Sequence, residues 1–281
     1  MVKNLYKYEF LALFRWVLPI DAFCLIMSLL LRVAIEIAQA VPDSPAVIIS
    51  AVLIGLTFFF SIIAMSVVAF WLVVVRFYKH LLSSEGYLTF TFPVSTTTHL
   101  VCKLVCGTVV SILSAVITLI GIIISFSGLL AEPLGEMAEL MFQDGNPLLS
   151  AEVLPHLIVF IVVMLIMFLA SAMFGLILPY TAMCIGQLSR KNKIAMSVVW
   201  YFVINTGISI ISEIVNVLNT MVLSNFMTDT ISFVSGTNEA IANMFVMYNS
   251  IFGFNALTFV IFIIAGFITC KYLLSNKLNL E

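Results

Sequence analysis

The chain has 281 residues, of which 63% are hydrophobic and 9% are charged, and its formal net charge is -2. Soluble domains carry roughly 25% charged and about 45–50% apolar residues, so this composition and the mean hydropathy of +1.20 exclude an ordinary soluble fold. The length accommodates about six membrane spans and leaves no long polar segment for a soluble domain. We therefore expect an all-α, polytopic membrane protein with a single transmembrane domain over residues 1–281.

Residues 1–16 are predicted to form an interfacial helix ahead of the first span. An apolar stripe is expected on one face of this helix, formed by Tyr6, Phe10, Leu13 and Val17. The basic residues that lie off this stripe are Lys3, Lys7 and Arg15. Cationic side chains beside an apolar stripe are typical of helices that lie among lipid headgroups. A plain cytoplasmic extension of the first span is the alternative.

Six apolar segments follow in the chain. Their predicted ranges are 17–40, 46–76, 100–130, 153–187, 195–225 and 248–274. Every Lys and Arg except Arg32 lies in or beside the segments that this order places on one side of the membrane. By the positive-inside rule, that side is the cytoplasm. We therefore expect a multi-pass protein of the cell membrane with both termini in the cytoplasm.

The segment 77–99, between the second and third spans, is predicted to form a cytoplasmic loop with a short amphipathic helix. Gly86 is placed to stop this helix, and Pro93 breaks the backbone again. Ser95 or Thr96 then caps the third span. Such an element is fixed by two spans, which suits a mechanical contact with a cytoplasmic partner.

This loop resembles the corresponding loop of ABC-2-type permeases, the membrane-spanning subunits of ABC exporters of Gram-positive bacteria. The family pattern has an aromatic and basic start, then Glu-Gly-Tyr-Leu, then Pro-Val-Ser and a lysine in the next helix. The matching residues here are Glu85, Gly86, Tyr87, Leu88, Pro93, Val94, Ser95 and Lys103. The N-terminal run Tyr8-Glu9-Phe10 and the order of spans also resemble this family.

The resemblance implies that 77–88 is the coupling helix that docks on a separate ABC ATPase subunit. The residues expected near that contact are Tyr78, Lys79, His80, Ser84, Glu85, Gly86 and Tyr87. It further implies a second permease chain, identical or a sister, with ATP and Mg bound by the ATPase. The chain contains no Gly-Lys pair, so it lacks a P-loop. We expect no enzyme activity, cofactor, metal or nucleic acid on this chain.

Polar residues recur inside two predicted spans. One stripe in the fifth span consists of Asn205, Ser209, Ser212, Glu213, Asn216 and Asn219, and a thinner one in the second span consists of Ser50, Thr57 and Ser61. Polar groups in hydrocarbon need partners or water. The stripes are therefore candidates either for a translocation path or for hydrogen bonds between helices. The family resemblance favours the path.

Charged residues at membrane depth form the last candidate site. Arg32 lies in the outer part of the first span, with Glu36 one turn further on and Glu213 at a similar depth in the fifth span. Ionisable groups at that depth are costly unless they are paired. We expect Arg32 to pair with Glu36 or with Glu213, as a structural staple or in substrate contact and gating.

The resemblance predicts the permease subunit of an ATP-driven exporter. Two other readings compete with it. A secondary transporter or channel would be typified by internal repeats and broken helices near the midplane, and neither is visible here. A membrane immunity or sensory protein would act without any nucleotide-binding partner.

Overall fold

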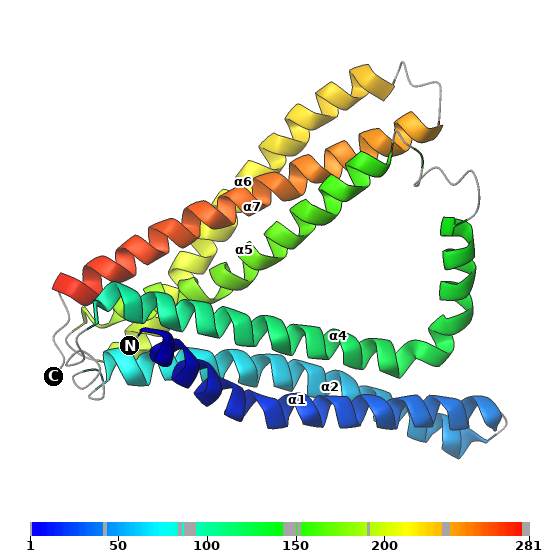
Figure 1. Cartoon of the computed structure of the whole chain (residues 1–281), viewed down its shortest axis with the longest axis horizontal. Helices are drawn as coiled ribbons and strands as arrows, with labels where there is room; N and C mark the ends of the chain where they lie inside the picture. The colour runs from blue at the N-terminus through cyan, green and yellow to red at the C-terminus, as the bar shows by residue number, and fades with distance from the viewer. Residues whose placement is uncertain are drawn as a thin grey trace. The chain divides into compact units, whose positions relative to one another are not determined.

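The computed structural model describes residues 2–41, 44–83, 86, 94–142, 150, 153–189, 192–231 and 237–276. Over these ranges the chain is helical and contains no strand (Figure 1). The elements are α1 (Val2–Ala40), α2 (Pro45–Phe77), the π-helical turn η1 (Tyr78–Leu82), α4 (Thr96–Phe142), α5 (Leu154–Gly186), α6 (Lys193–Ile231) and α7 (Thr237–Asn276). They form two compact units that divide within α4, after Glu136. Each unit is described by itself.

Within the described ranges, six helical segments are long and apolar enough to cross a membrane. They are Val2–Ala40, Pro45–Leu82, Thr96–Leu129, Leu154–Gly186, Lys193–Val222 and Ile241–Ser275. This confirms the expectation of about six helices suited to a polytopic membrane protein. The side on which the termini lie stays a prediction.

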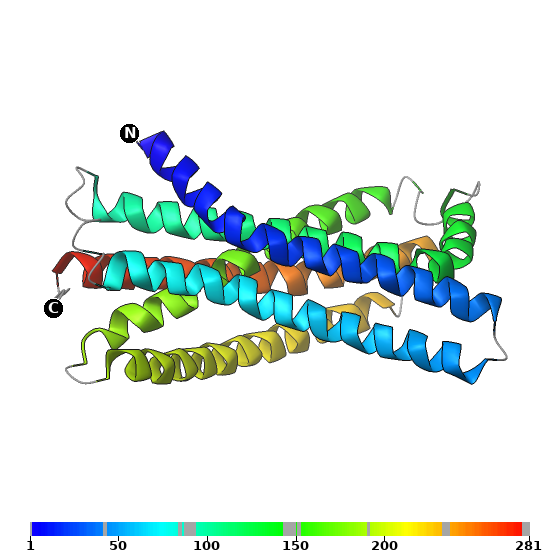
Figure 2. The same cartoon turned by 90° about the horizontal axis from the view of Figure 1, so that it is seen from below.

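The first helix differs from the expectation of a separate interfacial helix at 1–16. Residues 2–16 belong to α1 without a break, because Pro19 removes only one backbone hydrogen bond and the surrounding helix tolerates the loss. Within this continuous helix, the N-terminal part takes a different direction from the rest (Figure 2). The stripe predicted to face lipid is partly buried in the protein, with Leu13 4% and Val17 1% exposed.

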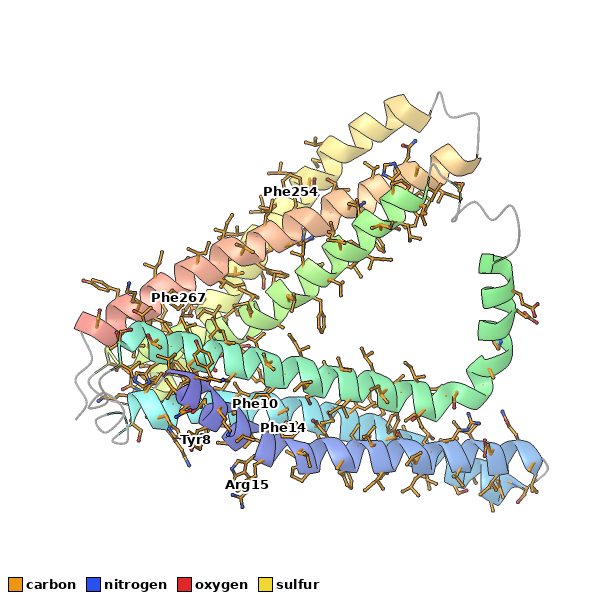
Figure 3. All side chains as sticks on the ribbon, viewed as in Figure 1. Tyr8, Phe10, Phe14, Arg15, Phe254 and Phe267 are labelled. Carbon is orange, nitrogen blue, oxygen red and sulfur yellow. The ribbon has the colours of Figure 1, made fainter. Side chains whose placement is uncertain are left out.

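In the first unit, α1 and α2 form an antiparallel pair. Pro45 begins α2, a position where its missing N–H costs nothing. The pair buries an apolar core of Cys24, Leu31, Phe58 and Met65. The N-terminal part of α1 also carries a stacked aromatic pair, Phe10 and Phe14, with ring centroids 5.6 Å apart (Figure 3).

The third span begins at a capped helix terminus. The backbone N–H of Thr98 donates a hydrogen bond to the Ser95 side-chain oxygen at 3.2 Å, as an N-cap requires. This confirms Ser95 as the cap of α4. Further along, Gly121 of α4 lies against Ser28 of α1, and Ser125 donates to the Ser28 carbonyl oxygen at 3.3 Å.

The second unit contains α5, α6 and α7. Gly266 of α7 lies so close to α5 that an added Cβ would stand 3.1 Å from Ile177. Phe174 and Phe259 stack between the same two helices, with ring centroids 5.0 Å apart. The turn from α5 to α6 passes through Asn192, whose φ of 54° is one that asparagine adopts more readily than most residues.

Candidate functional site

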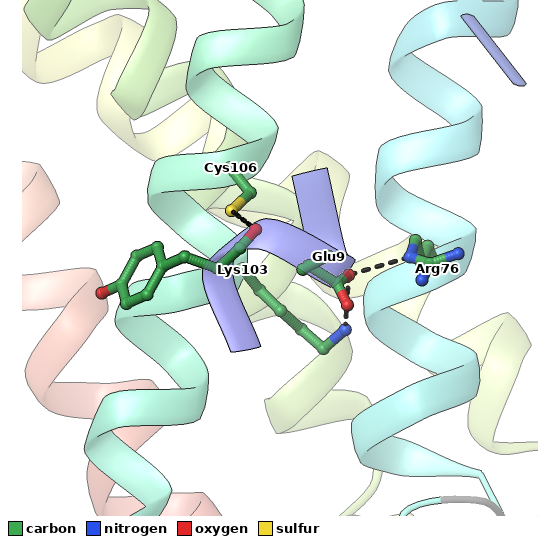
Figure 4. A network of polar contacts seen from close by, with 5 residues as sticks. Glu9, Arg76, Lys103 and Cys106 are labelled. Atoms are coloured by element: carbon green, nitrogen blue, oxygen red, sulfur yellow. Dashed lines mark hydrogen bonds and ion pairs between the residues drawn. The ribbon is translucent and has the colours of Figure 1, made fainter. Parts of the chain in front are cut away.

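One carboxylate joins three separate segments of the first unit. Glu9 of α1 accepts a hydrogen bond from Arg76 Nε at 2.8 Å and another from Lys103 Nζ at 3.0 Å, both on Oε1. Arg76 lies in the last turn of α2 and Lys103 lies near the start of α4, so these two cations flank the predicted coupling loop. Figure 4 shows the Glu9 side chain between them. The N-terminal segment is therefore tied to both ends of that loop.

This cluster is largely shielded from the surroundings. The side chain of Glu9 is 12% exposed, that of Lys103 is 7% exposed and that of Arg76 is 22% exposed. Cys106, one turn after Lys103, donates its thiol to the Tyr6 carbonyl oxygen at 3.6 Å. A buried cation that loses its partner carries a large desolvation cost, so the cluster holds the N-terminal part of α1 firmly in place.

The family resemblance also implies a coupling site in the loop, at 77–88. Tyr78, Lys79 and His80 form most of η1, which continues α2 as a π-helical turn. Leu81 and Leu82 anchor this turn, with exposed fractions of 0% and 6%. Lys79 is exposed and Gly86 is buried. The remaining predicted contacts, Ser84, Glu85 and Tyr87, lie outside the described residues.

Arg32, which the sequence predicts to lie at membrane depth, pairs with the acid on its own helix. Arg32 Nε lies 2.8 Å and Nη2 lies 2.6 Å from Glu36 Oε1. Its Nη1 donates to the Ser127 hydroxyl of α4. Gly128 makes room for the guanidinium, because a Cβ there would stand 2.8 Å from Arg32 Nη1. The alternative partner, Glu213, belongs to the second unit and is exposed there.

The polar stripe of α6 divides into two parts. Asn216 accepts a hydrogen bond from Asn255 Nδ2 of α7 at 2.9 Å, and Asn219 accepts one from the Ser250 hydroxyl at 3.4 Å. These two asparagines pack against α7, as the interhelical alternative requires. The other stripe residues are partly or well exposed: Asn205, Ser209, Ser212 and Glu213.

A depression lies where the two parts of this stripe meet, at Glu213 and Asn216. A shallow depression of about 340 Å³ is lined by Glu213, Asn216, Val217, Thr220 and Met221. An ionisable group on an exposed membrane helix is a functional candidate by default. In the described part of the chain, no ion pair involves Glu213.

The stripe of α2 is satisfied within its own helix. Ser50, Thr57 and Ser61 each donate to the backbone carbonyl three residues earlier, at 2.7–2.8 Å. A hydroxyl bonded in this way presents little unmet polarity to its surroundings. These three residues therefore offer a weaker candidate lining than the α6 stripe.

Two contacts were missed by the sequence reasoning. The first is the pairing of Glu9. Glu9 is the only acidic residue before Asp21, and it lies at the edge of the buried stripe of α1. These two features could have marked it as a candidate for a buried ion pair. The second is Asp21 itself, which is 3% exposed and accepts a hydrogen bond from Ser114 of α4 at 2.8 Å. No sequence pattern links that acid to that serine.

No group of three or more His, Cys, Asp or Glu residues that could hold a metal ion occurs in the described ranges. The chain matches no protein-family model, no curated protein and no solved structure. The function of this chain is therefore inferred from its own geometry and from the sequence pattern of its loop.

Proposed function

We propose that this chain is the permease subunit of an ATP-driven ABC exporter. In this proposal it forms the translocation path in the cell membrane, and a separate ABC ATPase supplies the energy. The observation that carries the proposal is the loop sequence, in which Glu85-Gly86-Tyr87-Leu88 and Pro93-Val94-Ser95 resemble the ABC-2-type pattern. The six apolar helices supply the membrane domain that such a subunit needs.

The charged cluster supports a mechanical role for this loop. The segment from Tyr78 to Ser95 is attached to α2 and α4, and Glu9 contacts the basic residue at each attachment. A partner that pushes on the loop would displace both helix ends together with the N-terminal segment. Charge-assisted hydrogen bonds are among the stronger polar contacts in proteins, so they suit the transmission of such a movement.

The proposed path uses the exposed part of the α6 stripe. Glu213 and the neighbouring depression on α6 offer polar groups at membrane depth. A second permease chain, identical or a sister, would cover this face and close the path. ATP and Mg would bind to the ATPase subunits, and both termini would lie in the cytoplasm with them.

The test is an affinity purification of the chain from its native membranes in mild detergent. We expect a soluble ATPase of the ABC class to co-purify, and we expect Glu85→Arg combined with Tyr87→Ala to abolish that association. The matched control is Glu139→Arg, which makes the same charge change at a site predicted to lie on the opposite side of the membrane. It should leave the ATPase bound.

A preparation without any ATPase, taken from membranes in which the chain is functional, would refute the permease proposal. That outcome would favour a secondary transporter, or an immunity or sensory protein. If the ATPase still co-purifies with the double variant, the ATPase is the partner but the loop is not its docking site.

A further inference from the structure

The N-terminal segment of α1, residues 2–16, has one exposed face that is rich in cations. Four exposed side chains of this segment recur every four residues, so they lie on one face of the helix: Lys3, Lys7, Leu11 and Arg15. Tyr8 and Trp16 lie beside them and are 68% and 64% exposed. These six residues form the basic face of α1.

The opposite side of the segment is fixed against the first unit. Glu9 accepts hydrogen bonds from Arg76 at 2.8 Å and from Lys103 at 3.0 Å. Leu13, one turn further on, is only 4% exposed. Figure 3 shows the Arg15 side chain directed away from the helices of the first unit. The buried contacts therefore determine the direction in which the basic face points.

The basic face carries three positive charges and no negative one. Glu9 is the only acidic residue before Asp21, and its carboxylate binds the two buried cations on the other side of the helix. In the described part of the chain, no ion pair involves Lys3, Lys7 or Arg15. A surface of this kind attracts a partner that presents negative charge.

The position of the basic face along α1 corresponds to the headgroup layer of a bilayer. Trp16 is a residue type that is enriched at membrane interfaces. The rest of α1, up to Ala40, is about 36 Å long and therefore crosses a hydrocarbon core of about 30 Å. The residues before Trp16 then lie outside the hydrocarbon. Tyr8 and Leu11 supply the apolar surface that suits its boundary.

The change of direction within α1 keeps the three cations near this layer. A straight helix along the membrane normal would carry Lys3 about 18 Å beyond Arg15, whereas the headgroup layer is about 5–8 Å deep. The N-terminal part instead takes a different direction from the rest of α1 (Figure 2). Pro19 lies within this helix, and proline is a common cause of kinks. Long basic side chains can cover the distance that remains.

We propose that the basic face of α1 binds the phosphate groups of anionic phospholipids at the membrane surface. Arg15 and the two lysines contact the phosphates, and the guanidinium suits them best. Tyr8, Leu11 and Trp16 lie at the boundary with the acyl chains. An anionic lipid is preferred over a zwitterionic one, because the ammonium of a zwitterionic headgroup offsets the charge of its phosphate. This inference is independent of the proposed transport function.

The experiment uses the full chain in vesicles of phosphatidylcholine and phosphatidylglycerol. The chain has three tryptophans, so Trp71→Phe combined with Trp200→Phe leaves Trp16 as the single fluorescent reporter. Brominated acyl chains, placed in one lipid at a time, quench Trp16 and give the relative binding constant of the two lipids beside it. We expect about a fivefold preference for phosphatidylglycerol, the factor contributed by one cation near an anionic surface.

Three variants of this reporter chain test the role of charge. Lys3→Gln combined with Lys7→Gln and Arg15→Gln should lower the preference to about one, because the face then has no charge. Lys3→Arg combined with Lys7→Arg should keep it. The matched control is Lys79→Gln combined with Lys271→Gln, which removes exposed cations outside the segment and should leave the preference unchanged. If the triple variant does not fold, 1 M salt should lower the preference of the reporter chain by screening.

Two results would overturn the proposal. One is equal quenching of Trp16 by the two lipids in the reporter chain, which would show that the basic face does not select anionic lipid. The other is a preference that persists in the triple glutamine variant or in 1 M salt, which would show that these three charges do not cause it.

Discussion

The carboxylate of Glu9 is the contact whose loss we expect to change the first unit most. Glu9→Gln keeps the size of the side chain and an oxygen acceptor but removes its charge. Lys103, with 7% of its side chain exposed, then lies buried without its counter-ion. Arg76 loses the same partner but is 22% exposed and keeps part of its hydration.

The magnitude follows from this burial. Removal of one partner from a buried ion pair costs about 3–5 kcal/mol, and the partial hydration of Arg76 argues for the lower end, about 3 kcal/mol. A change of that size raises the equilibrium constant for local opening of the N-terminal segment about 100-fold. The rest of the unit keeps its apolar core and does not open with it.

The assay is site-resolved alkylation of cysteine in detergent. Cys106 is 4% exposed and contacts the Tyr6 carbonyl oxygen, so it reacts with a maleimide only when the N-terminal segment opens. We expect its rate of modification to rise about 100-fold in Glu9→Gln, in proportion to the opening constant. Mass spectrometry separates this site from the other cysteines of the chain.

Two further variants test whether the buried charge of Lys103 causes the opening. Lys7→Gln removes an exposed charge from the same helical segment and should leave Cys106 protected. Glu9→Gln combined with Lys103→Met removes the buried charge that had lost its partner, so it should restore much of the protection. A rate for Glu9→Gln equal to that of the wild type would show that the cluster does not hold the segment.

Three other changes have expected outcomes. Ser114→Ala takes away the hydrogen bond to buried Asp21 at 2.8 Å and should cost about 1–3 kcal/mol, seen as a lower Tm in detergent. Asn216→Ala and Asn255→Ala, singly and together, should give a coupling energy of about 0.6 kcal/mol in a double-mutant cycle of unfolding; zero coupling would contradict the contact between α6 and α7. Gly186→Ala should destabilise the turn between α5 and α6 by about 1–3 kcal/mol, because the new Cβ would stand 2.7 Å from backbone atoms of α6; an unchanged Tm would contradict that close approach.

The span pattern could be predicted from sequence because its cause is local. Hydrocarbon satisfies no backbone hydrogen bond, so each crossing must be a continuous apolar helix. Ser95 also marked a helix start correctly, since the stereochemistry of a helix terminus depends only on nearby residues. The structure does not show the interfacial helix predicted at 1–16 as a separate element, because α1 continues from Val2 to Ala40 without a break.

The candidate sites were only partly predictable. The pairing of Arg32 with Glu36 is visible in sequence, because a spacing of four residues brings side chains together on any helix. The contribution of Ser127 and the space left by Gly128 could not be seen, since they depend on how α4 lies against α1. The same holds for Asn255, whose partner lies on another helix.

The sequence by itself therefore determined that this chain is helical, apolar and built to cross a membrane about six times. Only the tertiary structure decided which charges meet. Glu9 is 67 residues from Arg76 and 94 residues from Lys103, and helical periodicity carries no information over such separations. Long-range packing brings them together, because a buried charge is stable only where the fold supplies its partners.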